Sequence, residues 1–129
     1  MPRRLTLPPQ LAAWIDQKLP QLGGVSRVKL IHCERLPLER LWRGQKYTGL
    51  TLWNRIYLRE SACSPDFCDA PSVELLFHEL AHVLQFQKYP LSMPVRYLFG
   101  FVRYGYQNLP LEIEARELAA RLLREYTAQ

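Results

Sequence analysis

Residues 71–89 read PSVELLFHELAHVLQFQKY, and this segment predicts a long amphipathic helix around which the rest of the chain is organised. Apolar residues recur three and four positions apart and cover one face: Val73, Leu76, Phe77, Leu80, Val83 and Leu84. The opposite face carries His78, His82, Gln85 and Tyr89. Pro71 and Ser72 mark the start, with Ser72 as the expected N-cap, and Pro90 ends the helix.

The polar face contains an HExxH motif, His78-Glu79-Leu80-Ala81-His82. Residues four apart lie about 40° apart around a helix, so both imidazoles can reach one ion. Glu79 lies at the border of the two faces, where its carboxylate can take a proton from water instead of binding the metal. The alternative is a solvated face with two incidental histidines, but two of only three histidines in the chain lie here. The motif therefore predicts His78 and His82 as metal ligands and Glu79 as general base.

A hydrolytic zinc site usually takes a third ligand from the protein and leaves a fourth position for water. The longer metzincin pattern is excluded, because Gln85 and Lys88 stand where that pattern has Gly and His. Downstream of His82 the only carboxylate side chains are those of Glu112, Glu114, Glu117 and Glu125.

The helix expected over residues 111–126 distinguishes between these carboxylates. Its inward stripe consists of Leu111, Ala115, Leu118, Ala119, Leu122 and Tyr126. Glu112 lies at the edge of this stripe, whereas the other three glutamates share the outer face with arginines that can pair with them. The small alanines of the stripe would let this helix approach the histidine-bearing helix closely. Glu112 is therefore the expected third ligand, with Glu114 as second choice.

These residues resemble a known family. The order of His78–His82 followed by Glu112-Ile113-Glu114-Ala115-Arg116 is similar to that of the gluzincin metallopeptidases, especially the minimal bacterial minigluzincins. The resemblance spans roughly residues 45 to 125 and implies zinc bound by His78, His82 and Glu112, with Glu79 as base. It also implies an upstream antiparallel sheet whose free edge pairs with an extended peptide substrate, and Arg55–Arg59 is the candidate strand.

One position departs from the family pattern. Many members have an aspartate four residues after the ligand glutamate, and it holds the second nitrogen of a zinc-binding histidine. Arg116 occupies that position here, and Asn108 or a tyrosine is the candidate to replace the contact. The oxyanion-stabilising residue is open as well, because Tyr97, Tyr104 and Tyr106 also fit a role in core packing.

Weaker patterns on either side complete the expected architecture. The expected helices cover residues 9–20, 71–89, 94–104 and 111–126. The expected strands cover residues 25–32, 47–52 and 55–59. Residues 61–71 read as a loop. We therefore expect one α+β domain over residues 1–129, zincin-like, with a small antiparallel sheet packed against the HExxH helix and C-terminal helices.

Composition limits the class of protein further. The 129 residues are 48% hydrophobic and carry a net charge of +5, which fits a globular domain rather than a disordered chain. The most apolar stretch, residues 91–106, is interrupted by one proline, two arginines and two glycines, so no transmembrane segment is expected. No secretory signal is visible at the start of the sequence, which indicates a cytoplasmic location.

The three cysteines are an odd number and do not indicate a secreted disulfide framework. Cys63 and Cys68 could instead join the two motif histidines in a closed structural zinc site, but this would leave Glu79 and Glu112 without a role. The third histidine, His32, is expected to be structural or solvated.

The sequence favours zinc-dependent hydrolysis of peptide bonds, with Zn²⁺ as cofactor and a peptide or protein as substrate. One alternative is a non-catalytic zinc-containing binding or scaffold protein of the same fold. Another is a basic nucleic-acid-associated protein, which is less favoured because the arginines are scattered along the chain rather than clustered.

Overall fold

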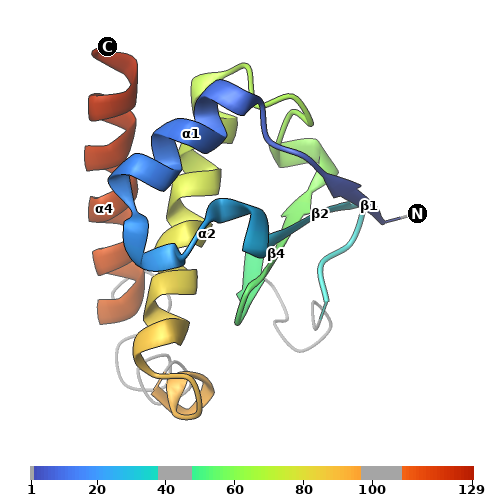
Figure 1. Ribbon diagram of the computed structural model, residues 1–129. Coiled ribbons are helices and arrows are strands. Elements are labelled where there is room, and N and C mark those ends of the chain that lie inside the picture. Colours follow the sequence, from blue (N-terminus) through green and yellow to red (C-terminus); the bar gives the residue numbers. More distant parts are fainter. Residues whose placement is uncertain (1, 38–47, 97–108) are drawn as a thin grey trace.

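The computed structural model describes residues 2–37, 48–96 and 109–129. The helices in this part of the chain are α1 (Pro9–Lys18), α2 (Ala70–Lys88) and α4 (Pro110–Thr127). The strands are β1 (Arg3–Leu5), β2 (Lys29–Cys33), β3 (Gly49–Leu52) and β4 (Arg55–Arg59), and short 3-10 turns lie at Pro20–Leu22, Val25–Arg27 and Glu60–Ala62. This arrangement confirms the expected α+β fold class (Figure 1).

The described strands form one sheet in the order β1-β2-β4-β3. The pairs β1–β2 and β3–β4 are antiparallel, but β2 and β4 run parallel. The expectation of a purely antiparallel sheet is therefore wrong, and the sheet is mixed. The β3–β4 hairpin inserts β4 beside β2, so that β3 takes the outer position. A strand pattern in the sequence marks the strand but does not encode its direction or its neighbour.

β4 is an inner strand, which corrects the expectation that Arg55–Arg59 offers a free edge. Its residues pair with β2 on one side and with β3 on the other. Ile56 and Leu58 have no exposed surface, as expected for the centre of a sheet. Among the described strands, the two edges are β1 and β3. Of these two, β3 packs against α2 and is therefore the edge nearer the HExxH motif.

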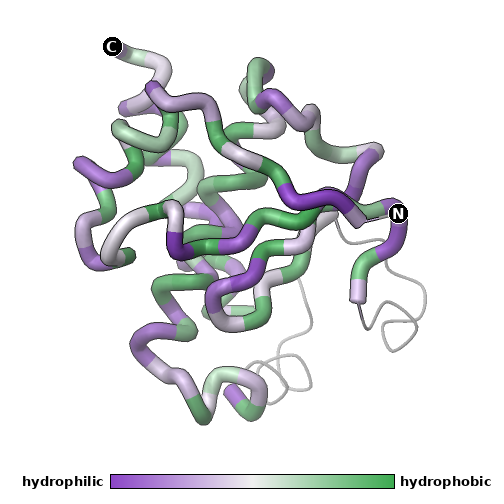
Figure 2. The backbone as a smooth tube through the Cα atoms, turned by 45° about the vertical axis from the view of Figure 1, so that its right-hand side comes forward, coloured by the Kyte–Doolittle hydropathy of each residue, from purple (hydrophilic) through white to green (hydrophobic). Residues whose placement is uncertain are grey.

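α2 lies between the sheet and α4, while α1 crosses near one end of both helices (Figure 1). The indole of Trp14 on α1 contacts Phe77 of α2 and Tyr126 of α4, with ring centroids 5.5 and 5.1 Å apart. Leu76 and Leu80 of α2 are fully buried in the same core. Figure 2 shows hydrophobic and hydrophilic residues alternating in short runs along the backbone, as amphipathic elements around one core require.

α2 begins earlier than expected, because its N-cap is Asp69 and not Ser72. Pro71 is tolerated in the first turn, since the first amides of a helix have no partner within it. Ser72 is buried, and its Oγ accepts a hydrogen bond from the backbone N–H of Ser64 at 2.8 Å. This serine therefore holds the preceding loop instead of capping the helix.

β2 is shorter than the strand expected over residues 25–32, because Val25–Arg27 forms a 3-10 turn. The backbone N–H of Val25 donates to Asp16 Oδ1 at 2.7 Å, which fixes this turn against α1. The helix expected over residues 94–104 has its first residues in a helical turn at 93–96, and the remainder lies outside the described residues.

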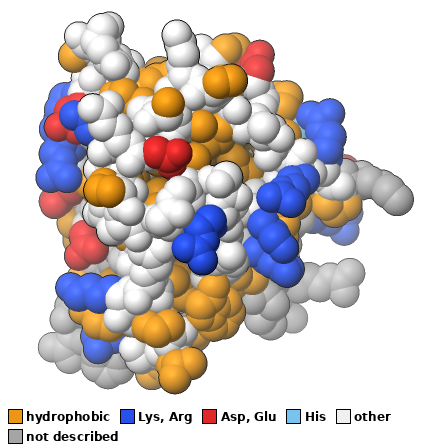
Figure 3. Space-filling view, viewed as in Figure 1, with side chains coloured by type: hydrophobic (Ala, Val, Ile, Leu, Met, Phe, Trp, Pro, Cys, Tyr) orange, Lys and Arg blue, Asp and Glu red, His pale blue; other side chains and the backbone are white. Residues whose placement is uncertain are grey.

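The surface gives two further observations. No helix in the described ranges combines the length and apolar character needed to cross a lipid bilayer. On the face shown in Figure 3, Lys and Arg side chains lie over both the helical side and the sheet side, with acidic side chains among them on the helical side.

Candidate metal centre

The two motif histidines and Glu112 converge at the interface of α2 and α4. The Nε2 atoms of His78 and His82 lie 3.2 Å apart, consistent with their spacing of one helical turn. Glu112 Oε2 lies 3.0 Å from His78 Nε2, and Glu112 Oε1 lies 2.9 Å from His82 Nε2. All three side chains expected to bind the metal are thus brought together, although Glu112 lies 34 positions from His78 in the sequence.

Close packing of α4 on α2 brings Glu112 to this position. Pro110 starts α4 after the fully buried Leu109, and Glu112 follows in the first turn. Ala115 and Ala119 are completely buried, and their small side chains allow the two helix axes to approach. Of the inward stripe predicted from the sequence, Ala115, Ala119 and Leu122 are buried, while the other three residues are partly exposed. Glu112 lies at the edge of this stripe and is only 3% exposed.

The separations between these atoms fit the coordination shell of a small ion. Ligand atoms bound to one tetrahedral zinc ion lie about 3.3 Å apart. The observed separations of 2.9 to 3.2 Å are close to that value. Two imidazoles and a carboxylate are also a donor set that zinc accepts. Within the described residues, His78, Glu79 and His82 are the group that could hold a metal ion, and Glu112 adjoins it.

The surroundings of His82 favour positive charge at the site. Burial favours the neutral ring, but the hydrogen bond to Glu112 and the charges of Glu79 and Glu112 outweigh it and raise the pKa of His82 to about 9. In the metal-free protein the ring is therefore protonated at neutral pH and forms an ion pair with Glu112. A metal ion that binds here displaces this proton.

The predicted general base, Glu79, is buried and is held in place by β3. The Thr51 hydroxyl lies 2.7 Å from Glu79 Oε1 and 3.1 Å from the backbone carbonyl oxygen of Glu79. The hydroxyl has one proton, and the shorter contact directs it to the carboxylate. Gly49 lies against the same side chain, because a Cβ atom at this position would be 3.1 Å from Glu79 Cδ. Sequence reasoning missed both residues, although a glycine within a strand often signals such a close approach.

The second-choice ligand, Glu114, has a different role. Its Oε1 accepts a hydrogen bond from Gln85 Nε2 at 3.1 Å, while Gln85 Oε1 lies 2.8 Å from His82 Nδ1. Gln85 thus contacts the second ring nitrogen of His82, a contact that the sequence analysis does not assign to it. Asn108, the candidate named for such a contact, lies outside the described residues. Arg116, at the position where the family has aspartate, is exposed, and its Nε contacts the backbone oxygen of Glu112 at 3.4 Å.

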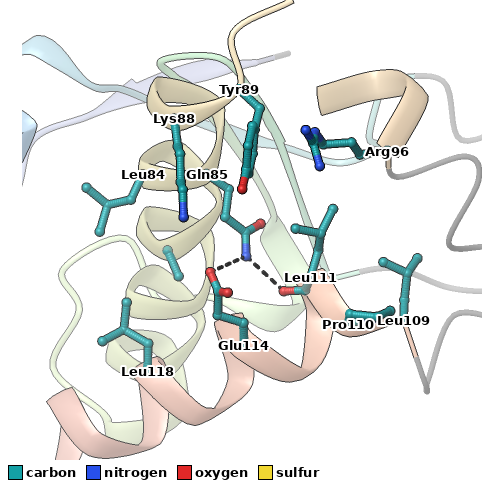
Figure 4. Close-up of a pocket in the computed structure, with 11 residues that line it drawn as sticks. Leu84, Gln85, Lys88, Tyr89, Arg96, Leu109, Pro110, Leu111, Glu114 and Leu118 are labelled. Atoms are coloured by element: carbon teal, nitrogen blue, oxygen red, sulfur yellow. Dashed lines mark hydrogen bonds between the residues drawn. The ribbon is translucent and has the colours of Figure 1, made fainter. Parts of the chain in front are cut away.

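A pocket of about 380 Å³ borders this arrangement between the C-terminal half of α2 and the start of α4 (Figure 4). Gln85 and Glu114 form part of its wall, and Lys88 and Arg96 lie at the same opening. The three residues expected to bind the metal do not line it. The pocket therefore adjoins the side of Gln85 that does not face His82.

The alternative zinc site with cysteines is not assembled in the described part of the chain. Cys63 and Cys68 are free thiols and belong to no cluster of metal-binding side chains there. Burial raises the pKa of the Cys63 thiol to about 11, which disfavours the thiolate that zinc requires. His32 Nε2 lies 2.9 Å from the backbone oxygen of Cys63, so His32 has the structural role expected.

The tyrosine and asparagine candidates, Tyr97, Tyr104, Tyr106 and Asn108, lie outside the described residues, so no oxyanion-stabilising residue is assigned.

Comparison of the chain with models of known protein families, with curated proteins and with solved structures found no match.

Proposed function

We propose that this protein is a zinc-dependent peptidase of the gluzincin type, with His78, His82 and Glu112 as ligands and Glu79 as general base. The observation that carries the proposal is the convergence of the three ligand side chains from two helices, each pair approaching within 3.2 Å. Glu79 lies beside these side chains on α2, the helix of the two histidines. It is buried, and Thr51 fixes its orientation. A hydrolytic zinc site needs this donor set together with a base that acts on water.

Glu79 is the residue that moves the proton in this reaction. When bound, Zn²⁺ supplies Lewis acidity, which polarises a peptide carbonyl and lowers the pKa of water. Glu79 takes one proton from the attacking water as the water oxygen bonds to the carbonyl carbon. The same carboxyl gives that proton to the amine as the carbon–nitrogen bond breaks, so that Glu79 ends as a carboxylate.

The proposed substrate is an extended peptide that pairs with the outer edge of β3. This edge lies beside Glu79, since Thr51 of β3 donates to its carboxylate. β4 has partners on both sides and cannot accept a further strand. Backbone hydrogen bonds along an edge strand align a peptide in extended form. An unstructured peptide or an unfolded protein segment is therefore the substrate class that this geometry favours.

The first prediction is that Glu79→Gln retains zinc but cleaves peptides at least about 100-fold more slowly, because the amide cannot accept the proton. Cleavage of a mixed peptide library is measured with and without a chelator, and zinc content is measured by elemental mass spectrometry. Glu74→Gln is the matched control, because Glu74 is an exposed glutamate on the same helix.

Cleavage by Glu79→Gln at the wild-type rate would contradict the mechanism. Zinc binding by the wild type without any chelator-sensitive cleavage would favour the non-catalytic zinc-containing scaffold instead. Binding of nucleic acid that weakens steeply with added salt would favour the third alternative.

A further inference from the structure

The orientation of the Gln85 side-chain amide is fixed by its partners. Gln85 Nε2 lies 3.0 Å from the backbone oxygen of Leu111 and 3.1 Å from Glu114 Oε1. Both partners are acceptors, so the NH₂ group must face them and the carbonyl oxygen must face the other way. Figure 4 shows the amide pointing from α2 toward these two acceptors on α4.

The remaining oxygen of this amide therefore faces His82. Gln85 Oε1 lies 2.8 Å from His82 Nδ1, and a carbonyl oxygen can only accept a hydrogen bond. Nδ1 of His82 must accordingly carry a proton, both in the protonated ring of the metal-free protein and in the neutral ring that binds a metal. Nε2 is the nitrogen directed toward His78 and Glu112. A zinc-binding histidine needs this tautomer, because Nε2 has to offer its lone pair.

We propose that Gln85 and Glu114 form a positioning pair that fixes the tautomer and ring orientation of His82. The inference rests on the proposed metal site and deepens it. In this pair, a neutral amide contacts the histidine, and a carboxylate on the neighbouring helix holds the amide. The pair replaces the direct carboxylate contact that Arg116 cannot make, and it ties α2 to the first turns of α4, where Glu112 lies.

The two members have different surroundings, which makes an exchange of their side chains feasible. Gln85 is 4% exposed, whereas Glu114 lies at the surface and beside the 380 Å³ pocket. In the double variant Gln85→Glu with Glu114→Gln, the new carboxylate can accept from His82 Nδ1 and from the new amide at position 114. Its second oxygen faces the backbone oxygen of Leu111, which loses its donor, so the exchange restores only part of the arrangement. In the single variant Gln85→Glu, two carboxylates face each other instead and repel.

Zinc affinity, measured by competition with a chromophoric chelator, tests the pair. Gln85→Leu keeps most of the side-chain volume but removes the acceptor, and we expect zinc affinity to fall about 10- to 100-fold. Gln85→Glu alone is expected to weaken binding as well, and the double variant to bind zinc more tightly than Gln85→Glu but less tightly than wild type. Gln87→Leu is the matched control, because Gln87 is exposed on the same helix and its replacement should leave the affinity unchanged.

A second readout does not require the metal. The His82 Nδ1–H should give a protected ring N–H signal in the NMR spectrum of the metal-free wild type and of the double variant. This signal should be lost in Gln85→Leu. If Gln85→Leu weakened zinc binding only by disturbing the fold, the exchange of side chains would not restore the affinity. Nor would a general disturbance remove one ring N–H signal selectively.

The outcomes separate the positioning pair from the proposed metal site. If wild type binds zinc and Gln85→Leu binds it equally tightly, the positioning pair is overturned while the metal site stands. If wild type binds no zinc, the proposed function fails, and the NMR signal alone then decides whether Gln85 holds His82. Retention of the protected signal in Gln85→Leu would overturn the pair in either case.

Discussion

At the scale of single residues, the site depends on a buried carboxylate whose partner lies on another element. Glu79 is only 4% exposed, and the cost of burying its charge is offset in part by the Thr51 hydroxyl at 2.7 Å. Gly49 allows the strand to approach closely enough for this contact. The proposed general base is thus oriented by the sheet and not by its own helix.

Replacement of Thr51 by valine is expected to lower the free energy of unfolding by about 1 to 3 kcal/mol, because it leaves a buried carboxylate without its hydroxyl donor at nearly unchanged volume. Urea unfolding of the purified proteins measures this difference. Thr51→Ser keeps the hydroxyl and should lose less stability than Thr51→Val. Equal stability of Thr51→Val and wild type would show that the hydrogen bond does not stabilise Glu79.

Some residues of the site were predictable and others were not, for a physical reason. His78, His82 and Glu79 share one helical turn, so local spacing places them together. Glu112 could be chosen because a helical wheel separates the edge of an apolar stripe from the exposed face. Thr51 reaches Glu79 from another element, and the contacts of Gln85 with Leu111 and Glu114 also cross between elements, so no local pattern in the sequence encodes them. The contact of Gln85 with His82 spans only three positions of one helix, but the spacing alone does not show that the two side chains bond.

At the scale of elements, the approach of α4 to α2 determines whether Glu112, the proposed third ligand, reaches the histidines. Ala115 and Ala119 lie in this interface with essentially no exposed surface. A larger side chain there cannot be accommodated without separating the helices or forcing strained rotamers. The position of Glu112 is therefore coupled to residues that do not touch the metal site.

Replacement of Ala119 by leucine is expected to destabilise the protein by about 1 to 3 kcal/mol through overpacking. It should also weaken zinc binding, because the displaced helix carries Glu112. Thermal unfolding and chelator competition measure the two effects. The control is Ala120→Leu, the same change at the next, partly exposed position of α4, which should be close to neutral. Unchanged zinc affinity in a clearly destabilised Ala119→Leu protein would contradict the coupling.

The helices were easier to predict than the sheet. Long periodic segments and prolines near their ends located α1, α2 and α4 to within a few residues. The strand segments at β3 and β4 were also recognisable. Strand order and direction were not, because they result from how the hairpin packs beside β2 and not from the residues within each strand.

At the scale of the whole molecule, the proposed metal would connect α2 to α4, the two helices that form the helical side of the fold. Zinc that binds the folded chain stabilises it by about 2.7 kcal/mol when free zinc exceeds the dissociation constant 100-fold. Protons compete for the same site, since the pKa of His82 in the metal-free protein is raised to about 9. Stability, metal content and pH are therefore linked.

The sign of this linkage follows from the protonation of His82. In the folded metal-free chain its pKa lies above the ordinary value of 6.5, so the protonated ring stabilises the fold below that pH, and this contribution is lost as the pH rises toward about 9. Zinc affinity rises over the same range, because fewer protons must be displaced. We expect urea unfolding to show metal-free protein becoming less stable between these values while the stabilisation by zinc increases. His82→Asn should abolish both trends, and a zinc effect that shrinks with rising pH would contradict the role of His82 as a ligand.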